Sequence, residues 1–336
     1  MTQTGQHFTF DKRCPVAALA LLFVVAIGLG KGLAQEMHTL AEPPTGGDRP
    51  NRFDFGRNAS TLRVNVDLVL VPVTVTDPQG RLVTGLDKRN FQIYEGKTEQ
   101  AIRHFSNEDS PVSLGILLDT SGSMKGKLER ARDAVMELLE TANPQDEFFM
   151  IRFSDRPELV TDFTTSVEDI QTQLLYGQPS GSTALLDAIY LGISKMRQAH
   201  YPRKALLVIS DGGDNHSRYH EREIKSAVRE ADTLMYAVGI YDHFFATVEE
   251  QLGPVLLDEL SKDTGGRMFT VDNPRDLPDI ATKISYELRN QYVLGYRPTD
   301  SAHDSKWHKI KVQLLLPKGM PRLDARAKKG YYASAE

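Results

Sequence analysis

The sequence has almost no cysteine and no excess of positive charge. Cys14 is the single cysteine among 336 residues, which excludes an intrachain disulfide framework and a cysteine-based zinc site. The 45 acidic side chains outnumber the 40 basic ones, so the formal net charge is −5. Nucleic-acid binders need clustered Lys and Arg to displace counterions from phosphates, and no such stripe is present, which argues against that class.

Long apolar runs are also scarce, because the only one is Cys14–Gly30 near the N-terminus. Two basic residues precede this run, and small residues, Gly32 and Ala34, stand before a candidate cleavage site. This pattern predicts a secretory signal peptide over residues 1–34, and therefore an exported protein, periplasmic or secreted. The alternatives are an uncleaved single-helix anchor over residues 14–30, since the run is slightly shorter than a span of ~20 residues, or a buried core helix.

Cleavage would change the composition of the working protein. It would remove Cys14 together with three basic residues and one acidic residue, leaving 37 basic and 44 acidic side chains and a net charge of −7. A cysteine-free, acidic chain suits an oxidising compartment. The basic region before the apolar run has no Arg-Arg pair, which favours the general export route over the twin-arginine route.

The chain length alone suggests about two domains. Residues 35–60 are rich in Pro, Gly and polar side chains without a period, so we expect a flexible linker there. Residues 61–109 then show apolar alternation typical of a small antiparallel β segment. Pro72 interrupts this alternation, which favours an edge position or a bulge. The strands expected here cover residues 62–75, 81–86, 91–94 and 101–105.

Between residues 110 and 290, strand and helix patterns alternate. The expected strands cover 113–119, 148–153, 205–210, 234–240 and 267–271, and the expected helices cover 128–142, 185–196, 221–231, 254–261 and 277–289. This succession predicts an α/β fold with a doubly wound, mostly parallel sheet and helices on both faces.

Beyond residue 290 the apolar period returns to two. Three further strands are expected, at 292–296, 310–316 and 323–327. Neither β segment has enough strands to be stable alone. We therefore expect residues 291–336 to pack with residues 61–109 as a sandwich-like subdomain, with the α/β domain inserted between them.

Carboxylate and hydroxyl side chains gather where the first and third strands of this domain end, and before one of its helices. Because the carboxyl ends of parallel strands meet at one edge of a sheet, these groups are expected to converge. Oxygen donors without His or Cys suit Mg²⁺ or Mn²⁺. Alternatively, the hydroxyls only cap helices and the second carboxylate only caps a turn. The predicted metal ligands are Asp119, Ser121, Ser123, Thr183 and Asp211.

The order of these five residues resembles the metal-ion-dependent adhesion site of the von Willebrand factor type A (VWFA) domain, whose pattern is D-x-S-x-S followed by a distant T and a distant D. The segment from Val75 to Phe105 and the ending from Tyr292 to Tyr332 (YVLGYRP…HKIKVQLLLP…KKGYY) are similar to the exported bacterial VWFA-related family. The resemblance covers nearly everything from residue 62 onward. It implies a metal-binding, adhesion-type fold and says little about the partner.

The resemblance also implies roles for the ligands. Ser121, Ser123 and Thr183 would bind Mg²⁺ (or Mn²⁺) directly, while Asp119 and Asp211 would supply charge directly or through water. One position on the metal would stay open for the oxygen of a Glu or Asp carboxylate on a partner protein.

Other polar residues near this edge carry weaker signals. His216 and His220 lack a third ligand at a sensible spacing and are interpreted as surface residues rather than as an accessory metal pair. Asp214 and Asn215 are interpreted as shaping their loop. Asp187, one turn into the helix after Thr183, is interpreted as facing solvent rather than as an acceptor behind the metal site.

An enzyme is the rival class. The sequence contains no GxSxG elbow, Walker loop, GxGxxG or HExxH pattern. Ser121 also stands where a haloacid-type phosphoryl-transfer enzyme would carry its second Asp. We therefore expect a non-enzymatic, divalent-metal-dependent protein-binding module with no nucleic-acid partner. The alternatives are an envelope assembly scaffold with an incidental metal and, more remotely, a Mg²⁺-dependent hydrolase.

Overall fold

The computed structural model describes residues 68–241, 248–271, 273–299, 306–317 and 319–333. The predicted signal peptide or anchor at 1–34 and the predicted linker at 35–60 lie outside these residues. All of the described residues belong to one compact unit, Arg63–Glu336. Within that described part of the chain, no helix is both long and apolar enough to cross a membrane.

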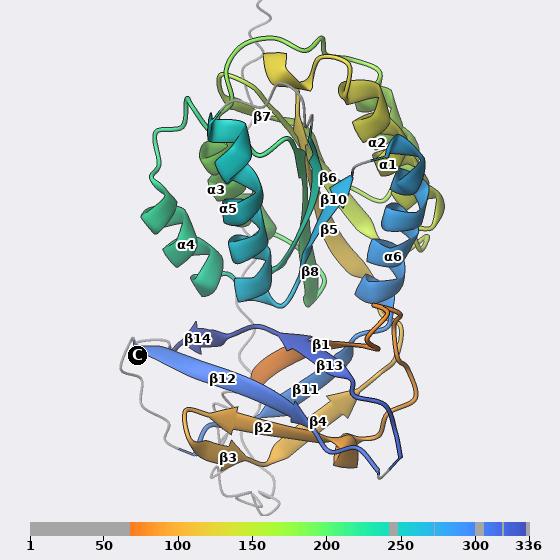
Figure 1. Cartoon of the computed structure of the whole chain (residues 1–336), viewed down its shortest axis with the longest axis vertical. Coiled ribbons are helices and arrows are strands. Elements are labelled where there is room, and N and C mark those ends of the chain that lie inside the picture. Colours follow the sequence, from red (N-terminus) through yellow and green to blue (C-terminus); the bar gives the residue numbers. More distant parts are fainter. Residues whose placement is uncertain (1–67, 242–247, 272, 300–305, 318, 334–336) are drawn as a thin grey trace, which may run out of the picture. The chain divides into compact units, whose positions relative to one another are not determined.

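A six-stranded sheet with the order β10-β9-β8-β5-β6-β7 forms the centre of the α/β domain (Figure 1). Its strands are β5 (Val112–Asp119), β6 (Glu147–Phe153), β7 (Pro157–Thr164), β8 (Arg203–Ser210), β9 (Leu234–Ile240) and β10 (Met268–Val271). Every neighbouring pair is parallel except β6 and β7. The central strands β5, β8 and β9 are buried along almost their whole length, as expected for strands covered on both faces.

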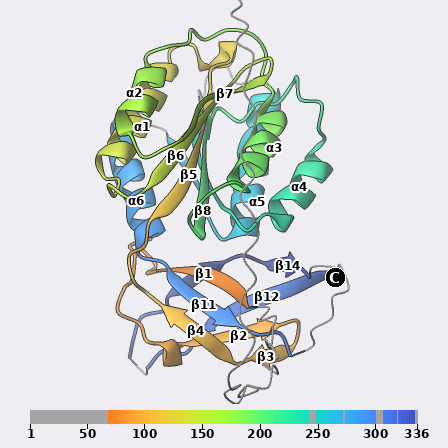
Figure 2. The ribbon, with the colours of Figure 1, turned by 180° about the vertical axis from the view of Figure 1, so that it is seen from behind.

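Helices cover both faces of this sheet (Figures 1 and 2). On one face lie α1 (Leu128–Glu140), α2 (Val167–Leu174) and α6 (Leu277–Arg289), and on the other lie α3 (Leu185–Met196), α4 (Glu221–Glu230) and α5 (Val248–Thr264). Each set packs its apolar side chains against the sheet in a core of its own. The predicted doubly wound, mostly parallel fold is thus confirmed.

Several elements differ from the sequence prediction. Strand β7 and helix α2 were not expected, because one is a half-exposed edge strand and the other is short and largely polar. Helix α5 begins before Pro254, whereas we expected that proline to open the helix. The strand expected at 81–86 is wrong, because the structure forms only an isolated bridge between Thr76 and Leu82 there.

The two β segments form two antiparallel four-stranded sheets, with the orders β13-β1-β11-β4 and β14-β12-β2-β3. Their strands are β1 (Val69–Thr76), β2 (Phe91–Glu95), β3 (Thr98–Gln100), β4 (Ile102–Ser106), β11 (Tyr292–Tyr296), β12 (Trp307–Leu314), β13 (Asp324–Ala327) and β14 (Gly330–Tyr332). One apolar core joins the two sheets and includes Val73, Ile93, Leu294 and Ile310. The predicted sandwich-like subdomain, built from segments before and after the α/β domain, is confirmed.

Pro72 lies in β1, which has neighbours on both sides. It is paired with Val293 of β11, whereas the ladder with β13 starts only at Val73. A proline has no N–H to donate, and it occupies the part of β1 that has a strand on one side only.

Buried polar contacts fix the sandwich against the α/β domain. Arg203, at the start of β8, donates to the carbonyl of Glu108, on the connection into β5, and to the carbonyl of Arg289, the last residue of α6. Glu287 of α6 pairs with Arg267 and with Arg326 of β13, the latter at 2.7 Å. The connection from β4 enters β5 at its amino end, and the other connection runs from the end of α6 to β11. The sandwich therefore lies opposite the edge at which β5 and β8 end (Figure 1).

Candidate metal centre

Two buried carboxylates lie at the carboxyl ends of neighbouring strands. Asp119 is the last residue of β5, and Asp211 directly follows Ser210, the last residue of β8. The strands pair in parallel with Leu118 opposite Ile209, so both end at the same edge of the sheet. Neither aspartate is exposed to solvent.

Asp119 is held by hydrogen bonds to both of its oxygens. Oδ1 accepts from the main-chain N–H of Ser121 at 2.8 Å, and Oδ2 accepts from the hydroxyl of Ser210 at 2.6 Å. The same hydroxyl accepts from the N–H of Gly212, which links the two strand ends. Burial raises the pKa of Asp119 to about 7, and the negative charge of Asp211 adds to the shift.

Ser121 and Ser123 follow in a tight turn, which continues as a short 3₁₀ helix, Gly122–Met124. Their hydroxyl oxygens lie 3.0 Å apart, so both groups reach the same region. The N–H of Gly122 donates to the carbonyl of Gly181 at 3.0 Å, which brings the segment before α3 against this turn.

Thr183 lies on that segment and is buried. Its N–H donates to the side chain of Asn215, and its carbonyl accepts from the N–H groups of Asn215 and His216. The segment therefore contacts both the turn after β5 and the loop after β8. All five predicted ligands lie on segments that contact one another directly.

Asp211 has one carboxylate oxygen in an ion pair and one without a hydrogen-bond donor among the described residues. Its Oδ2 accepts from the ammonium of Lys127 at 3.0 Å, and the side chains of Asp211 and Lys127 are 1% and 11% exposed. Its Oδ1 is buried without a hydrogen-bond partner among the described residues. A buried carboxylate oxygen without a donor is costly unless a cation compensates it.

Lys127 is the residue that sequence reasoning missed. It directly precedes α1, close to the D-x-S-x-S pattern, and that proximity is the only signal that the sequence carried. A lysine there could equally have extended into solvent, as Lys125 does.

The surrounding polar residues have structural roles. Asp214 accepts from the hydroxyl of Ser217, in keeping with its predicted loop-shaping role, and burial raises its pKa. The interpretation of Asp187 as solvent-facing is wrong, because it is buried and accepts from the N–H groups of Arg218 and Tyr219.

The donor set fits a hard divalent cation. It combines two carboxylates with three hydroxyls, which are the oxygen ligands that Mg²⁺ and Mn²⁺ prefer. The two buried carboxylates face a single ammonium group, so one negative charge and the Oδ1 atom of Asp211 remain uncompensated. In the part of the chain described here, no cluster of three or more His, Cys, Asp or Glu residues could hold a metal ion by itself.

Residues 114–213, which include all five predicted ligands, match the family model of the von Willebrand factor type A domain. The match begins within β5 and ends in the loop after β8, so it spans the segments that carry the site. Because of this similarity, the α/β domain is called the A domain below.

Curated relatives have modest sequence identity to this chain. Inter-alpha-trypsin inhibitor heavy chain H4 of Homo sapiens is 25% identical over 203 residues, which are 55% of this chain and 21% of that protein. Heavy chain H3 of Bos taurus is 28% identical over 158 residues, 42% of this chain and 17% of that protein. The chain thus spans about a fifth of the length of the curated relatives that it matches.

Solved structures also resemble the chain. The von Willebrand factor type A protein from Catenulispora acidiphila has a TM-score of 0.49 and 12% identity, covering 81% of this chain and 64% of that one. The conserved hypothetical protein BatB from Bacteroides thetaiotaomicron has a TM-score of 0.43 and 20% identity, covering 52% and 98%.

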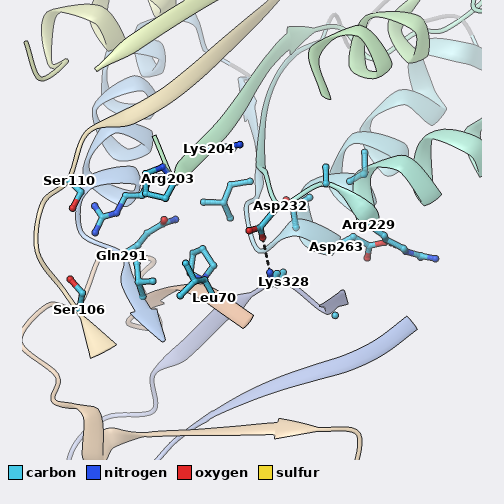
Figure 3. Close-up of a pocket in the computed structure, with 18 of the residues that line it drawn as sticks. Leu70, Ser106, Ser110, Arg203, Lys204, Arg229, Asp232, Asp263, Gln291 and Lys328 are labelled. Atoms are coloured by element: carbon cyan, nitrogen blue, oxygen red, sulfur yellow. Dashed lines mark hydrogen bonds and ion pairs between the residues drawn. The ribbon is translucent and has the colours of Figure 1, made fainter. Parts of the chain in front are cut away.

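A cavity of about 180 Å³ lies at the other end of the A domain, between β1 and β11 of the sandwich and the starts of β8 and β9 (Figure 3). Its acidic side chains are paired, Asp232 with Lys328 at 2.7 Å and Asp263 with Arg229 at 2.8 Å. Arg203 in its wall binds main-chain carbonyls. The cavity therefore offers no cluster of free carboxylates and is separate from the Asp119 site.

Proposed function

We propose that this chain is an exported, non-enzymatic module that binds a partner protein through a divalent metal ion held by the A domain. The observation that carries the proposal is the buried, unpartnered Oδ1 of Asp211 beside the buried carboxylate of Asp119. Export rests on the signal-peptide pattern of residues 1–34.

The hydroxyl and carboxylate side chains of the site would have different roles. The hydroxyls of Ser121, Ser123 and Thr183 would hold the ion, and Asp119 and Asp211 would supply the negative charge directly or through water. Bound Mg²⁺ or Mn²⁺ would supply a Lewis-acidic centre for an oxygen from outside the chain. A Glu or Asp carboxylate of a partner protein has the matching charge and hardness.

The loop that carries Asp211 is preorganised for this role. Gly212 has a φ of +83°, and a Cβ at that position would lie 2.9 Å from the main chain of Gly253. The hydroxyl of Ser210 holds both Asp119 and the N–H of Gly212. Because these contacts fix the loop before any ligand arrives, little ordering would be needed on binding.

Paired peptide probes test this function. We would immobilise synthetic peptides that contain a single Glu or Asp, together with their Gln or Asn counterparts, and measure binding of the full chain in Mg²⁺ and in EDTA. We expect binding only to the acidic peptides, only with Mg²⁺, and not by Thr183→Ala. Thr172→Ala, which removes an exposed hydroxyl from α2, serves as the matched control.

The same experiment separates the alternatives. Equal binding in Mg²⁺ and EDTA would contradict metal-dependent binding and favour a scaffold with an incidental metal. Mg²⁺-dependent turnover of p-nitrophenyl phosphate or p-nitrophenyl acetate, lost in Asp119→Ala, would instead favour the hydrolase.

A further inference from the structure

Lys127 adds a positive charge to the site that the five-residue pattern does not include. Its ammonium lies 3.0 Å from Oδ2 of Asp211. Its side chain is only 11% exposed, although lysine is rarely buried unless paired. Asp119, Asp211 and Lys127 thus form a buried cluster with a formal charge of −1.

The position of Lys127 is fixed by its main chain. Its N–H donates to the carbonyl of Met124, and its own carbonyl accepts from the N–H of Ala131 in the first turn of α1. Asp155, a further carboxylate beside this segment, accepts from the N–H of Ser182. Among the described residues, Lys127 is the cation that pairs directly with one of the proposed ligands.

We propose that Lys127 is a built-in counter-cation that weakens divalent metal binding and gives the loaded site a net positive charge that selects carboxylate ligands. This inference rests on the metal site proposed above. It assigns to Lys127 a control of affinity and specificity that the five ligands alone do not provide.

The charges of the cluster explain both effects. A divalent ion that binds to Asp119 and Asp211 must approach the ammonium of Lys127, and like charges repel strongly at partly buried sites. Once bound, the ion brings the cluster from −1 to +1, and one incoming carboxylate makes it neutral. With a neutral residue at position 127, the loaded cluster would already be neutral and would attract a carboxylate less.

The test compares the wild-type chain with Lys127→Met and Lys127→Gln. The glutamine keeps a donor for Asp211 without the charge, so it separates the charge from the hydrogen bond if the methionine variant folds poorly. Lys125→Met is the matched control, because Lys125 is an exposed lysine two residues away. Each full-length protein is stripped with EDTA, checked by circular dichroism and titrated calorimetrically with MnCl₂.

We expect the Kd for Mn²⁺ to fall about tenfold or more in both Lys127 variants and to change less than about twofold in Lys125→Met. We also expect metal-free Lys127→Met to have a lower melting temperature than metal-free wild type, because Asp211 loses its buried partner. Addition of Mn²⁺ should raise the melting temperature more in this variant than in wild type. If folded Lys127→Gln has a Kd for Mn²⁺ equal to or higher than that of wild type, the role of Lys127 is overturned while the metal site stays intact. No saturable Mn²⁺ binding by wild type or by either Lys127 variant would overturn both proposals.

Discussion

Asp119 is a fully buried carboxylate whose proton affinity depends on its surroundings. Burial raises its pKa from 3.8 to about 7, with a further contribution from the charge of Asp211. The folded chain therefore holds this proton more tightly than the unfolded chain does. Protonation stabilises the fold at low pH, and that stabilisation is lost as the pH rises from about 4 to about 7.

The metal-free wild-type protein should lose stability between pH 5 and pH 8. From Asp119 alone we expect the free energy of unfolding to fall by about 2 to 3 kcal/mol over this range. Asp119→Asn cannot ionise and should show a flatter profile, and saturating Mg²⁺ should flatten that of wild type. Urea unfolding at a series of pH values measures this, with both proteins in EDTA and wild type also in Mg²⁺. Identical slopes for the two proteins in EDTA would contradict the prediction.

The sequence indicated the five proposed ligands because their types and spacing form a pattern along the chain. It could not indicate the pairing of Lys127 with Asp211, since a lysine before a helix can turn inward or outward. It also misplaced Asp187, whose burial depends on the loop carrying Arg218 and Tyr219 folding back onto α3. Whether a loop covers a helix in this way depends on tertiary structure, which the helical periodicity of the sequence does not encode.

The central strands of the six-stranded sheet pack closely because β5 has a glycine at its middle. A Cβ on Gly115 would lie 2.2 Å from the ring of Phe149 in β6 and 2.6 Å from Leu206 in β8. Both neighbours are buried, so neither side chain has space to move aside.

We expect Gly115→Ala to lower the free energy of unfolding by about 3 kcal/mol through overpacking. Gly192→Ala in α3 is the matched comparison, because its nearest atoms are the flexible ends of Leu117 and Leu206 at 3.2 Å or more, and alanine favours the helix. Chemical unfolding of both variants measures the difference. A Gly115→Ala protein as stable as wild type would contradict this packing.

The elements that the sequence predicted best were those buried on both faces, such as β5 and β8, since they appear as continuous apolar runs. Strand β7 was missed because it is an edge strand partly exposed to solvent, and such a strand needs no continuous apolar run. Helix α2 was missed because only Ile170 and Leu174 of its eight residues are buried.

A charged triad around the buried Glu287 connects the sandwich to the A domain. Glu287 of α6 lies between Arg267 and Arg326, and Arg326 belongs to β13. Glu287 is almost fully buried. Removing it would leave two guanidinium groups without their common partner.

We expect Glu287→Ala to lower the free energy of unfolding by about 3 to 5 kcal/mol. Glu259→Ala should cost less than about 1 kcal/mol, because its pair with Lys225 is partly exposed to solvent. Thermal unfolding of the two variants gives the comparison. Equal melting temperatures would show that the triad does not stabilise the junction.

Strands from the two ends of the chain depend on each other. β1 pairs with β11 and β13, and β2 pairs with β12 and β3. A chain that stops at Asn290 should therefore lose amide protection in β1 and β2 in hydrogen exchange. A chain that stops at Ala333 is the control, and retained protection in β1 of the shorter chain would contradict the pairing.

The joint subdomain was predictable because neither β segment had enough strands alone. The partners within it were not, since strands more than 200 residues apart, such as β1 and β11, carry no local signal of register. Their pairing, such as Val71 opposite Leu294, emerges only when both segments bury their apolar faces in one core.

The proposed site would hold one divalent metal ion at Asp119, Ser121, Ser123, Thr183 and Asp211. Equilibrium dialysis of EDTA-stripped protein against Mn²⁺, followed by elemental analysis, measures how many ions the chain binds. We predict about one Mn²⁺ ion per wild-type chain and none for folded Asp119→Ala or Ser121→Ala. No bound Mn²⁺ in the folded wild-type protein, or an undiminished ratio in both variants, would contradict the claim.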